Sequence, residues 1–406
     1  MNAACLNADV QSFFRKWMVD VVDAQRADGQ FPMVAPLCVA EDDGGPAYAD
    51  AGVICPWTIY QFYGDKTHLA KQYPSMRKFI AFCRGRSLPG GLAPEKFHCF
   101  GDWLNVDAET PRDLIYTAYF GLSTQLAAQA ARELGFTSDA EEYDRLFAEI
   151  QQGFTKKYFN AEGRTECDTQ SSYVLALAYN LVPQDLRPLV AERLIEGINK
   201  RGGKLSTGFI GTRDIMVTLA SIGRNDIAYH LLQQPEYPGW MYSIGLGATS
   251  IWEHWDGWTP DKGFEDAHMN SFAHYSFGAV YGWMVENIGG IQRGAPAYAK
   301  VIIAPQPGGT LTSARTKYDS IRGPVETDWQ LADGTMTLNF ETPANTTTLV
   351  RLPTKDAGAV RADGQPLASL NVTPRTTGQG VEFELPSGRY NFVFPVKTVG
   401  TYIPKP

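Results

Sequence analysis

The sequence has little that would tie it to nucleic acid or to a membrane. The formal net charge of the 406 residues is −8, and no run of Lys or Arg forms a local basic patch. Phosphate-rich partners need such a patch, so nucleic acid and anionic lipid surfaces are unfavourable partners. No apolar stretch approaches the ~20 residues that a membrane-spanning helix needs. We therefore expect no nucleic-acid and no membrane partner.

Cysteine is scarce and carries no recognisable pattern. The six cysteines all lie in the first half of the chain and form no C-x-x-C pair: Cys5, Cys38, Cys55, Cys83, Cys99 and Cys167. Their spacing fits no zinc template, and a chain of this length needs no disulfide framework. We predict buried thiols in a reducing compartment, with no metal and no cofactor. The opening MNAACLNADVQSFF lacks the basic and apolar regions of an export signal, which predicts a cytoplasmic protein.

Several common catalytic motifs are also missing. The sequence contains no H-E-x-x-H, no G-x-S-x-G, no P-loop and no G-x-G-x-x-G. Zinc protease, serine hydrolase and nucleotide-binding functions therefore have no support.

Residues 1–295 carry a helical pattern. Segments with apolar residues on most sides, such as TAYFGLSTQLAAQAA, alternate with amphipathic ones, such as EEYDRLFAEIQQGF. An inner ring of helices covered by an outer ring produces this alternation, because inner helices are covered on both sides. The pattern predicts a mainly α protein with an (α/α)6-type toroid. About ten helices are expected where a closed toroid has twelve.

Residues 296–406 carry a different pattern. Short runs with period-2 alternation, such as VETDWQLA and TMTLNFET, are separated by PGG, ADG and PSG turns. This pattern predicts a smaller antiparallel β-sandwich, to which we assign a supporting role.

One stretch, SIWEHWDGWTPDKGF at residues 250–264, holds three of the nine tryptophans around a glutamate. Aromatic faces stack on sugar rings and carboxylates accept hydroxyl protons, so the stretch suits a cleft for a neutral, polyhydroxylated ligand. Glu253 is the candidate general base or nucleophile of a glycosidase. The alternative is a glutamate in a salt bridge at a loop edge. Trp252 and Trp255 are either stacking platforms or core residues.

Further candidates lie in four other polar and aromatic loops, at residues 40–52, 98–111, 204–214 and 268–277. Asp102, in GDWL, is a hydroxyl acceptor or an acceptor of backbone N–H groups. Asp50 either faces the ligand or caps the helix that follows it. His274, expected within a helix over residues 269–290, is either ligand-facing or a core histidine. Tyr48 and Trp103 are stacking platforms or core residues.

The motifs GDWL, TPRDLIYTAYF, LSTGFIGT, SIWEHWDGW and MNSFAHYSFGAVYGWM, in this order, resemble bacterial α-L-rhamnosidases of glycoside hydrolase family 78. The resemblance extends over nearly the whole chain. It implies an (α/α)6 barrel followed by a β-sandwich, and inverting hydrolysis of terminal α-L-rhamnosides. By position, Glu253 would be the general base and His274 would contact the sugar. The family usually has Trp where this sequence has Tyr48, which keeps an aromatic platform there.

The resemblance also points to a departure. In the family, the general acid lies in a segment upstream of the helix that begins here at about Asn7. The resemblance implies that the same upstream residues supply the first barrel helices, so the toroid is expected to lack them, in agreement with the count of about ten. An inverting glycosidase needs two carboxyl groups. The chain is therefore expected to be a fragment that lacks its acid and is inactive alone, unless Asp102, Asp42 or Asp43 replaces it. The alternative is a non-catalytic rhamnoside-binding protein with a degenerate barrel. A third interpretation is another toroid glycosidase, of the glucoamylase or trehalase kind.

Overall fold

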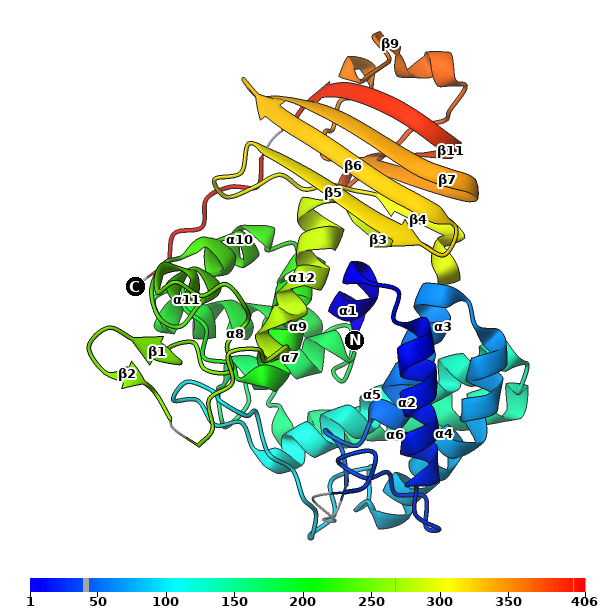
Figure 1. The fold of residues 1–406 in the computed structure, drawn as a ribbon, viewed down its shortest axis with the longest axis vertical. Helices are drawn as coiled ribbons and strands as arrows, with labels where there is room; N and C mark the ends of the chain where they lie inside the picture. The colour runs from blue at the N-terminus through cyan, green and yellow to red at the C-terminus, as the bar shows by residue number, and fades with distance from the viewer. Residues whose placement is uncertain (39–43, 267, 397, 406) are drawn as a thin grey trace.

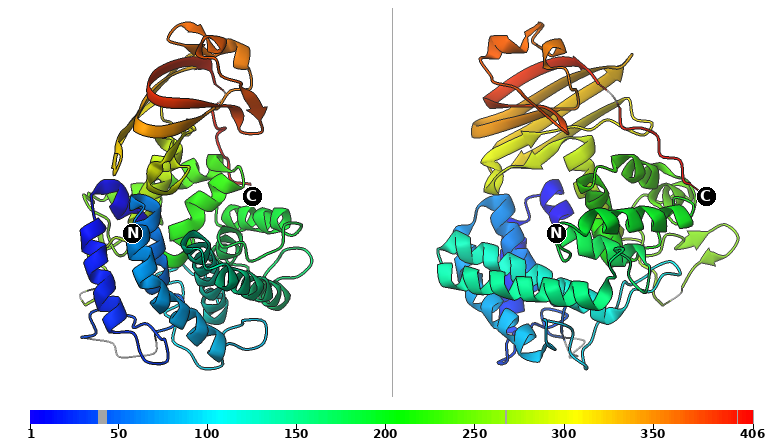
Figure 2. Two further views of the ribbon diagram at one scale, coloured as in Figure 1. Left: turned by 90° about the vertical axis from the view of Figure 1, so that its right-hand side faces the viewer. Right: turned by 180° about the vertical axis from the view of Figure 1, so that it is seen from behind.

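The computed structural model describes residues 1–38, 44–266, 268–396 and 398–405. Asp42 and Asp43 lie outside the described residues. A helical part carries a β-sheet part against one of its sides (Figure 1), and the views from the side and from behind show the same arrangement (Figure 2). No helix in the described ranges is both long enough and apolar enough to cross a membrane.

One set of helices is amphipathic. In α6, for example, the buried residues recur every three or four positions, from Ala140 to Phe154, while the intervening residues face solvent. This spacing places a single apolar stripe on the helix, which covers its neighbours on one side. The set comprises α2 (Gln11–Asp23), α4 (Lys66–Arg86), α6 (Thr137–Tyr158), α8 (Arg187–Lys200) and α10 (Asn225–Gln233).

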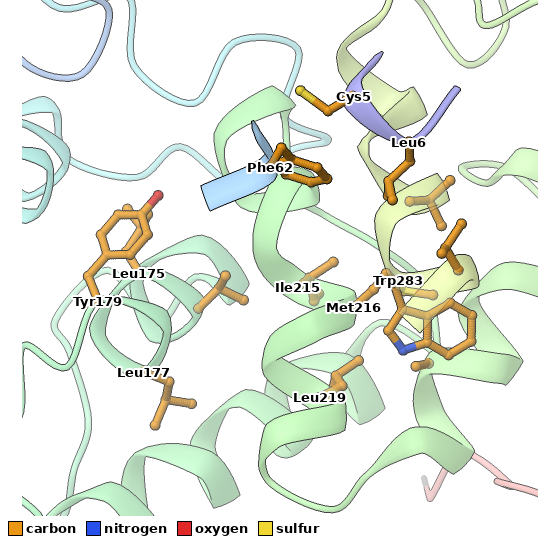
Figure 3. Close-up of a cluster of buried hydrophobic side chains, with 14 of the residues drawn as sticks. Cys5, Leu6, Phe62, Leu175, Leu177, Tyr179, Ile215, Met216, Leu219 and Trp283 are labelled. Atoms are coloured by element: carbon orange, nitrogen blue, oxygen red, sulfur yellow. The ribbon is translucent and has the colours of Figure 1, made fainter. Parts of the chain in front are cut away.

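The other set is buried on most sides. In α7 every residue from Gln170 to Leu177 is buried. Successive members contact one another, α3 with α5, α5 with α7, α7 with α9 and α9 with α12, as an inner ring requires. The set comprises α3 (Ala51–Tyr63), α5 (Arg112–Leu134), α7 (Gln170–Ala178), α9 (Phe209–Ser221) and α12 (Val280–Trp283). Figure 3 shows Ile215, Met216 and Leu219 of α9 in the core beside Trp283 of α12. The predicted toroid of paired helices is confirmed.

The expected helix over residues 269–290 is wrong in its first part. Regular structure begins only with η1 (Ser276–Ala279), which runs into α12 and then into the π-helix η2 (Met284–Ile288). Upstream of Ser276 the backbone pairs with another loop: Glu253 N–H donates to Ser271 O (2.8 Å) and His274 N–H donates to Ile251 O (2.9 Å). These bonds replace the intrahelical ones, so His274 lies in a loop. Two short helices, α1 (Asn2–Asn7) and α11 (Trp240–Gly245), complete the α elements of the described residues.

In the described residues the C-terminal part is a nine-stranded sheet built around two long strands, β7 and β11, which pair along most of their length. Its pairings are antiparallel except that β4 runs parallel to β7. β3 precedes the expected boundary at residue 296 and already pairs with β4. The strands are β3 (Ile291–Arg293), β4 (Lys300–Ile303), β5 (Ser313–Ser320), β6 (Gly323–Ala332), β7 (Thr335–Leu352), β8 (Arg361–Ala362), β9 (Gln365–Pro366), β10 (Arg375–Thr377) and β11 (Gly380–Pro395).

Side-chain hydrogen bonds connect the sheet to the end of the helical part. The indole N–H of Trp329 donates to Ile288 O (2.8 Å), and the hydroxyl of Thr327 donates to Gly289 O (2.7 Å). Both donors are buried. They satisfy carbonyl groups at the end of the π-helix that would otherwise be buried without partners.

The prediction of six buried thiols is wrong for two of them. All six cysteines are free, but Cys38 is exposed and Cys167 is partly exposed. Cys38 lies in a surface loop, where few other residues pack against its side chain.

Candidate active site

Glu253 is held in place by the backbone of a second loop. Its Oε2 accepts a hydrogen bond from Ser271 N–H (2.9 Å), and its own N–H donates to Ser271 O. The residue is 9% exposed. One carboxylate oxygen is thereby fixed by backbone, while Oε1 faces Nε2 of His274 at 3.9 Å. No Lys or Arg lies within ion-pair distance of Glu253 among the described residues, so the salt-bridge alternative has no support there.

The His274 ring packs against two aromatic rings. The Phe209 ring stacks on it at 4.8 Å between centroids, and the Tyr275 ring lies nearly parallel at 5.7 Å. The imidazole side chain retains 25% exposure and Tyr275 is 83% exposed. A stacked ring loses rotamer freedom, so its Nε2 stays directed at Glu253.

Asp102 is a structural acceptor. Each of its oxygens accepts two hydrogen bonds: Oδ1 from the N–H groups of Ile210 (2.8 Å) and Gly211 (3.1 Å), and Oδ2 from Gly208 N–H (2.9 Å) and from the hydroxyl of Ser171. The carboxylate thus caps the N-terminus of α9 and is only 2% exposed. The geometry therefore favours the backbone-acceptor interpretation and leaves no oxygen free to donate a proton to a leaving group.

Asp102 also brings two of the loops together. The next residue, Trp103, accepts a hydrogen bond at its carbonyl from Phe209 N–H (2.9 Å). Phe209 is the residue that stacks on His274. The loop at residues 98–111 is therefore connected, through Phe209, to the loop that holds Glu253.

Tyr48 and Trp103 contribute to an aromatic group around Phe100. Both rings meet Phe100 edge to face, at 5.0 Å for Tyr48 and 6.2 Å for Trp103. The Tyr48 hydroxyl donates to Gly101 O (2.8 Å), which fixes the ring. Trp103 is 37% exposed and Phe100 38% exposed, so part of each side chain is open to solvent.

Asp50 is buried more deeply. It is 1% exposed, and the hydroxyl of Ser123 on α5 donates to its Oδ1 (2.5 Å). It precedes α3, but its side chain makes no capping hydrogen bond there. Within the described part of the chain, its Oδ2 has no hydrogen-bond partner. Burial raises the pKa of Asp50 to about 7, against the opposing effects of Ser123 and the Arg213 guanidinium.

The two tryptophans beside Glu253 have different environments. Trp255 is 5% exposed and stacks on Phe277 at 3.8 Å, so the structure places it in the core. Trp252 is partly exposed and meets the Phe272 ring edge to face at 5.0 Å.

Sequence reasoning missed Phe100, Phe209 and Phe272, each of which lies in a loop that it had singled out. A lone Phe side chain has no polar atom and is typical of a core residue, so only the fold shows that these rings contact Trp103, His274 and Trp252. Among the described residues, no group of three or more His, Cys, Asp or Glu side chains is arranged to hold a metal ion.

Comparison with known proteins identifies the family of the chain. A sequence model of the bacterial α-L-rhamnosidase six-hairpin glycosidase domain matches residues 1–288, and one of the bacterial α-L-rhamnosidase C-terminal domain matches residues 290–365. An α-L-rhamnosidase of Streptomyces avermitilis is 45% identical over 341 residues, which cover 84% of this chain and 33% of that protein. One from Formosa agariphila is 33% identical over 367 residues, which cover 88% of this chain and 39% of that protein.

Solved structures give the same result. The crystal structure of the Streptomyces avermitilis α-L-rhamnosidase complexed with L-rhamnose has a TM-score of 0.88 and 42% identity, over 95% of this chain and 36% of that one. The α-L-rhamnosidase of Aspergillus terreus has a TM-score of 0.87 and 28% identity, over 98% of this chain and 45% of that one. The chain thus spans less than half the length of these relatives. Its two matched parts and its fold show that the chain belongs to the bacterial α-L-rhamnosidase six-hairpin glycosidase family.

Proposed function

We propose that this chain binds the rhamnosyl unit of an α-L-rhamnoside and supplies the general base for its inverting hydrolysis. The observation that carries the proposal is the Glu253 carboxylate, which is fixed at Oε2 by Ser271 and open at Oε1 toward His274. A base must hold one oxygen ready to take a proton from water, and this arrangement leaves Oε1 in that position. The exposed rings of Trp103 and Phe100 supply the stacking surface that a sugar needs.

The test uses a substrate whose hydrolysis depends on the general base but not on a general acid. With α-L-rhamnosyl fluoride the leaving group needs no protonation by a strong general acid, so the full chain is expected to hydrolyse it through Glu253 alone. Glu253→Gln is expected to lower kcat by at least about 10²-fold. Glu265→Gln, an exposed carboxylate of the neighbouring hairpin, is the control and should retain the rate.

The stereochemistry gives a second readout. NMR of the first product should show β-L-rhamnose, because a water activated on the face opposite the leaving group inverts the anomeric carbon. Equal rates for Glu253→Gln and the unmodified chain would rule out Glu253 as the base, and α-L-rhamnose as first product would rule out inversion.

A second candidate is rhamnoside recognition without cleavage. It is favoured by the environment of Asp102, because this candidate for the acid has all its acceptor positions occupied. Calorimetric binding of L-rhamnose together with an unchanged fluoride substrate would support this candidate over the hydrolytic one.

A further inference from the structure

A row of aromatic rings extends outward from the position of Glu253. Trp252 meets Phe272 edge to face at 5.0 Å, and Phe272 meets Phe264 in the same way at 5.7 Å. Phe264 is 68% exposed. Single exposed rings are common on protein surfaces, but three aromatic rings in contact form a continuous apolar surface of the kind that marks binding sites.

This row is attached to the proposed base at both of its inner members. Trp252 directly precedes Glu253, and Phe272 directly follows Ser271, whose N–H binds the Glu253 carboxylate. The hydroxyl of Ser250 also donates to Phe272 O, which ties the two segments together once more. The backbone that carries the two inner rings is therefore joined by hydrogen bonds to the backbone and carboxylate of Glu253.

Phe264 sits on a small hairpin that projects from the helical part (Figure 1). The hairpin consists of β1 (Trp258–Thr259) and β2 (Gly263–Phe264), and Phe264 lies directly opposite Trp258. Residues directly opposite in an antiparallel pair point to the same face, so the two rings share one face of the hairpin. At its base, Gly257 O accepts hydrogen bonds from Glu265 N–H (3.1 Å) and from the Asn270 side chain (2.6 Å).

The chemistry of the row indicates what it would receive. Phe264 and Phe272 have no polar side-chain atom, so they recognise a ring by its flat face and not by its hydroxyl groups. The exposed charged groups on the hairpin are Asp261, Glu265 and Asp266 with one cation, Lys262. This excess of negative charge disfavours an anionic group.

We propose that Trp252, Phe272 and Phe264 form the surface that receives the leaving group of the rhamnoside, and that this leaving group presents a flat, uncharged ring. The inference rests on the proposed function, because it places the rhamnosyl unit at Glu253. In it Phe264 determines specificity for the leaving group and takes no part in binding the rhamnosyl unit itself.

The experiment measures binding in the full chain carrying Glu253→Gln, in which no substrate is consumed. The calorimetric ligands are L-rhamnose and its methyl, phenyl and 4-carboxyphenyl α-glycosides. The phenyl glycoside should bind about threefold to tenfold more tightly than the methyl glycoside, as expected for ring stacking. The 4-carboxyphenyl glycoside should lose most of this gain.

Adding Phe264→Ala should bring the phenyl-to-methyl affinity ratio below about twofold and leave the affinity for L-rhamnose unchanged, whereas Phe264→Trp should retain the ratio. The control is Phe13→Ala on α2, since Phe13 is also 68% exposed and meets its neighbour Phe14 at 5.3 Å.

Two results would overturn the inference in different ways. If the phenyl-to-methyl ratio is the same in the Phe264→Ala and Phe13→Ala chains while L-rhamnose binds to both, the surface does not receive the leaving group and the proposed function stands. If L-rhamnose binds to none of the chains, the proposed function fails and the inference fails with it.

Discussion

Asp102 holds Gly208, a residue 106 positions later in the chain, by a 2.9 Å hydrogen bond from the glycine N–H to the carboxylate. This bond and its companions to Ile210 and Gly211 place the N-terminus of α9 against the loop that carries Trp103. The position of Phe209, and through it that of His274, therefore depends on a carboxylate that does not contact Glu253.

Asp102→Asn should destabilise the protein by about 2–4 kcal/mol. The amide keeps one acceptor oxygen but turns an N–H₂ group toward backbone donors, which leaves buried N–H groups unsatisfied. The measurement is urea unfolding followed by circular dichroism. Asp144→Asn, which breaks a pair with Arg132 in which both side chains are about half exposed, is the control and should cost less than about 1 kcal/mol. Equal losses in the two variants would contradict the structural role of Asp102.

Asp50 should make the stability of the protein pH-dependent between about pH 4 and pH 7. Its pKa rises from 3.8 to about 7 on burial, so the folded state holds a proton that the unfolded state has lost in this window. Stability from this group is therefore full below pH 4 and falls as pH rises, by about 1.4 kcal/mol per pH unit, until about pH 7.

The variant that tests this is Asp50→Asn, which carries no ionisable proton. Its Tm relative to the unmodified chain should increase as the pH is raised from 4 to 7.5. The same difference for Asp363→Asn, an exposed carboxylate of the C-terminal sheet, should stay flat. A pH-independent difference for Asp50→Asn would show that Asp50 is ionised in the folded protein throughout.

The inner and outer layers of helices could be predicted from the sequence, but the course of the backbone through the candidate site could not. The alternation of buried and amphipathic segments reports how many sides of a helix are covered, and α6 and α7 follow it closely. The segment before Ser276, MNSFAHY, is also rich in apolar residues. It forms no helix because its backbone pairs with Ile251 and Glu253. Such pairing joins residues about twenty positions apart, and local periodicity contains no signal for it.

The candidate residues show the same limit. Sequence alone left Asp102 open between a ligand contact and a backbone acceptor, and only its four hydrogen bonds separate the two. Trp252 and Trp255 look alike in the sequence, but one is partly exposed and the other is packed against Phe277. The spacing of aromatic residues in an irregular loop does not determine which of them faces inward.

Trp329→Phe should weaken the attachment of the sheet to the helical part. Phenylalanine keeps most of the packing but removes the indole N–H, which leaves Ile288 O buried without its donor. We expect a loss of about 1–3 kcal/mol in the free energy of unfolding, measured by urea titration. Trp103→Phe, at a partly exposed indole, is the comparison and should change stability by less than about 1 kcal/mol. A smaller loss for Trp329→Phe than for Trp103→Phe would contradict this role.

Thiol labelling should distinguish Cys38 from the buried cysteines. In the native protein Ellman's reagent should react first with Cys38, because it is exposed, whereas burial raises the pKa of Cys55 to about 12 and keeps it as an unreactive thiol. Cys38→Ser should remove the fast phase only. A fast phase that persists in Cys38→Ser would place the reactive thiol elsewhere, and urea should expose all six in the unmodified chain.

The hydrogen bonds at Gly257 O close the base of the β1–β2 hairpin, and Glu253 is held by Ser271 on the side of this base away from the hairpin tip. The residues between Trp258 and Phe264 lie beyond this base, so they can be exchanged, shortened or extended while the hydrogen bonds that hold the carboxylate are retained. If the proposed role of Phe264 holds, changing this one small loop alters which leaving groups are accepted while Glu253 keeps its hydrogen bond to Ser271. For enzyme engineering, the same segment is the place to graft or randomise.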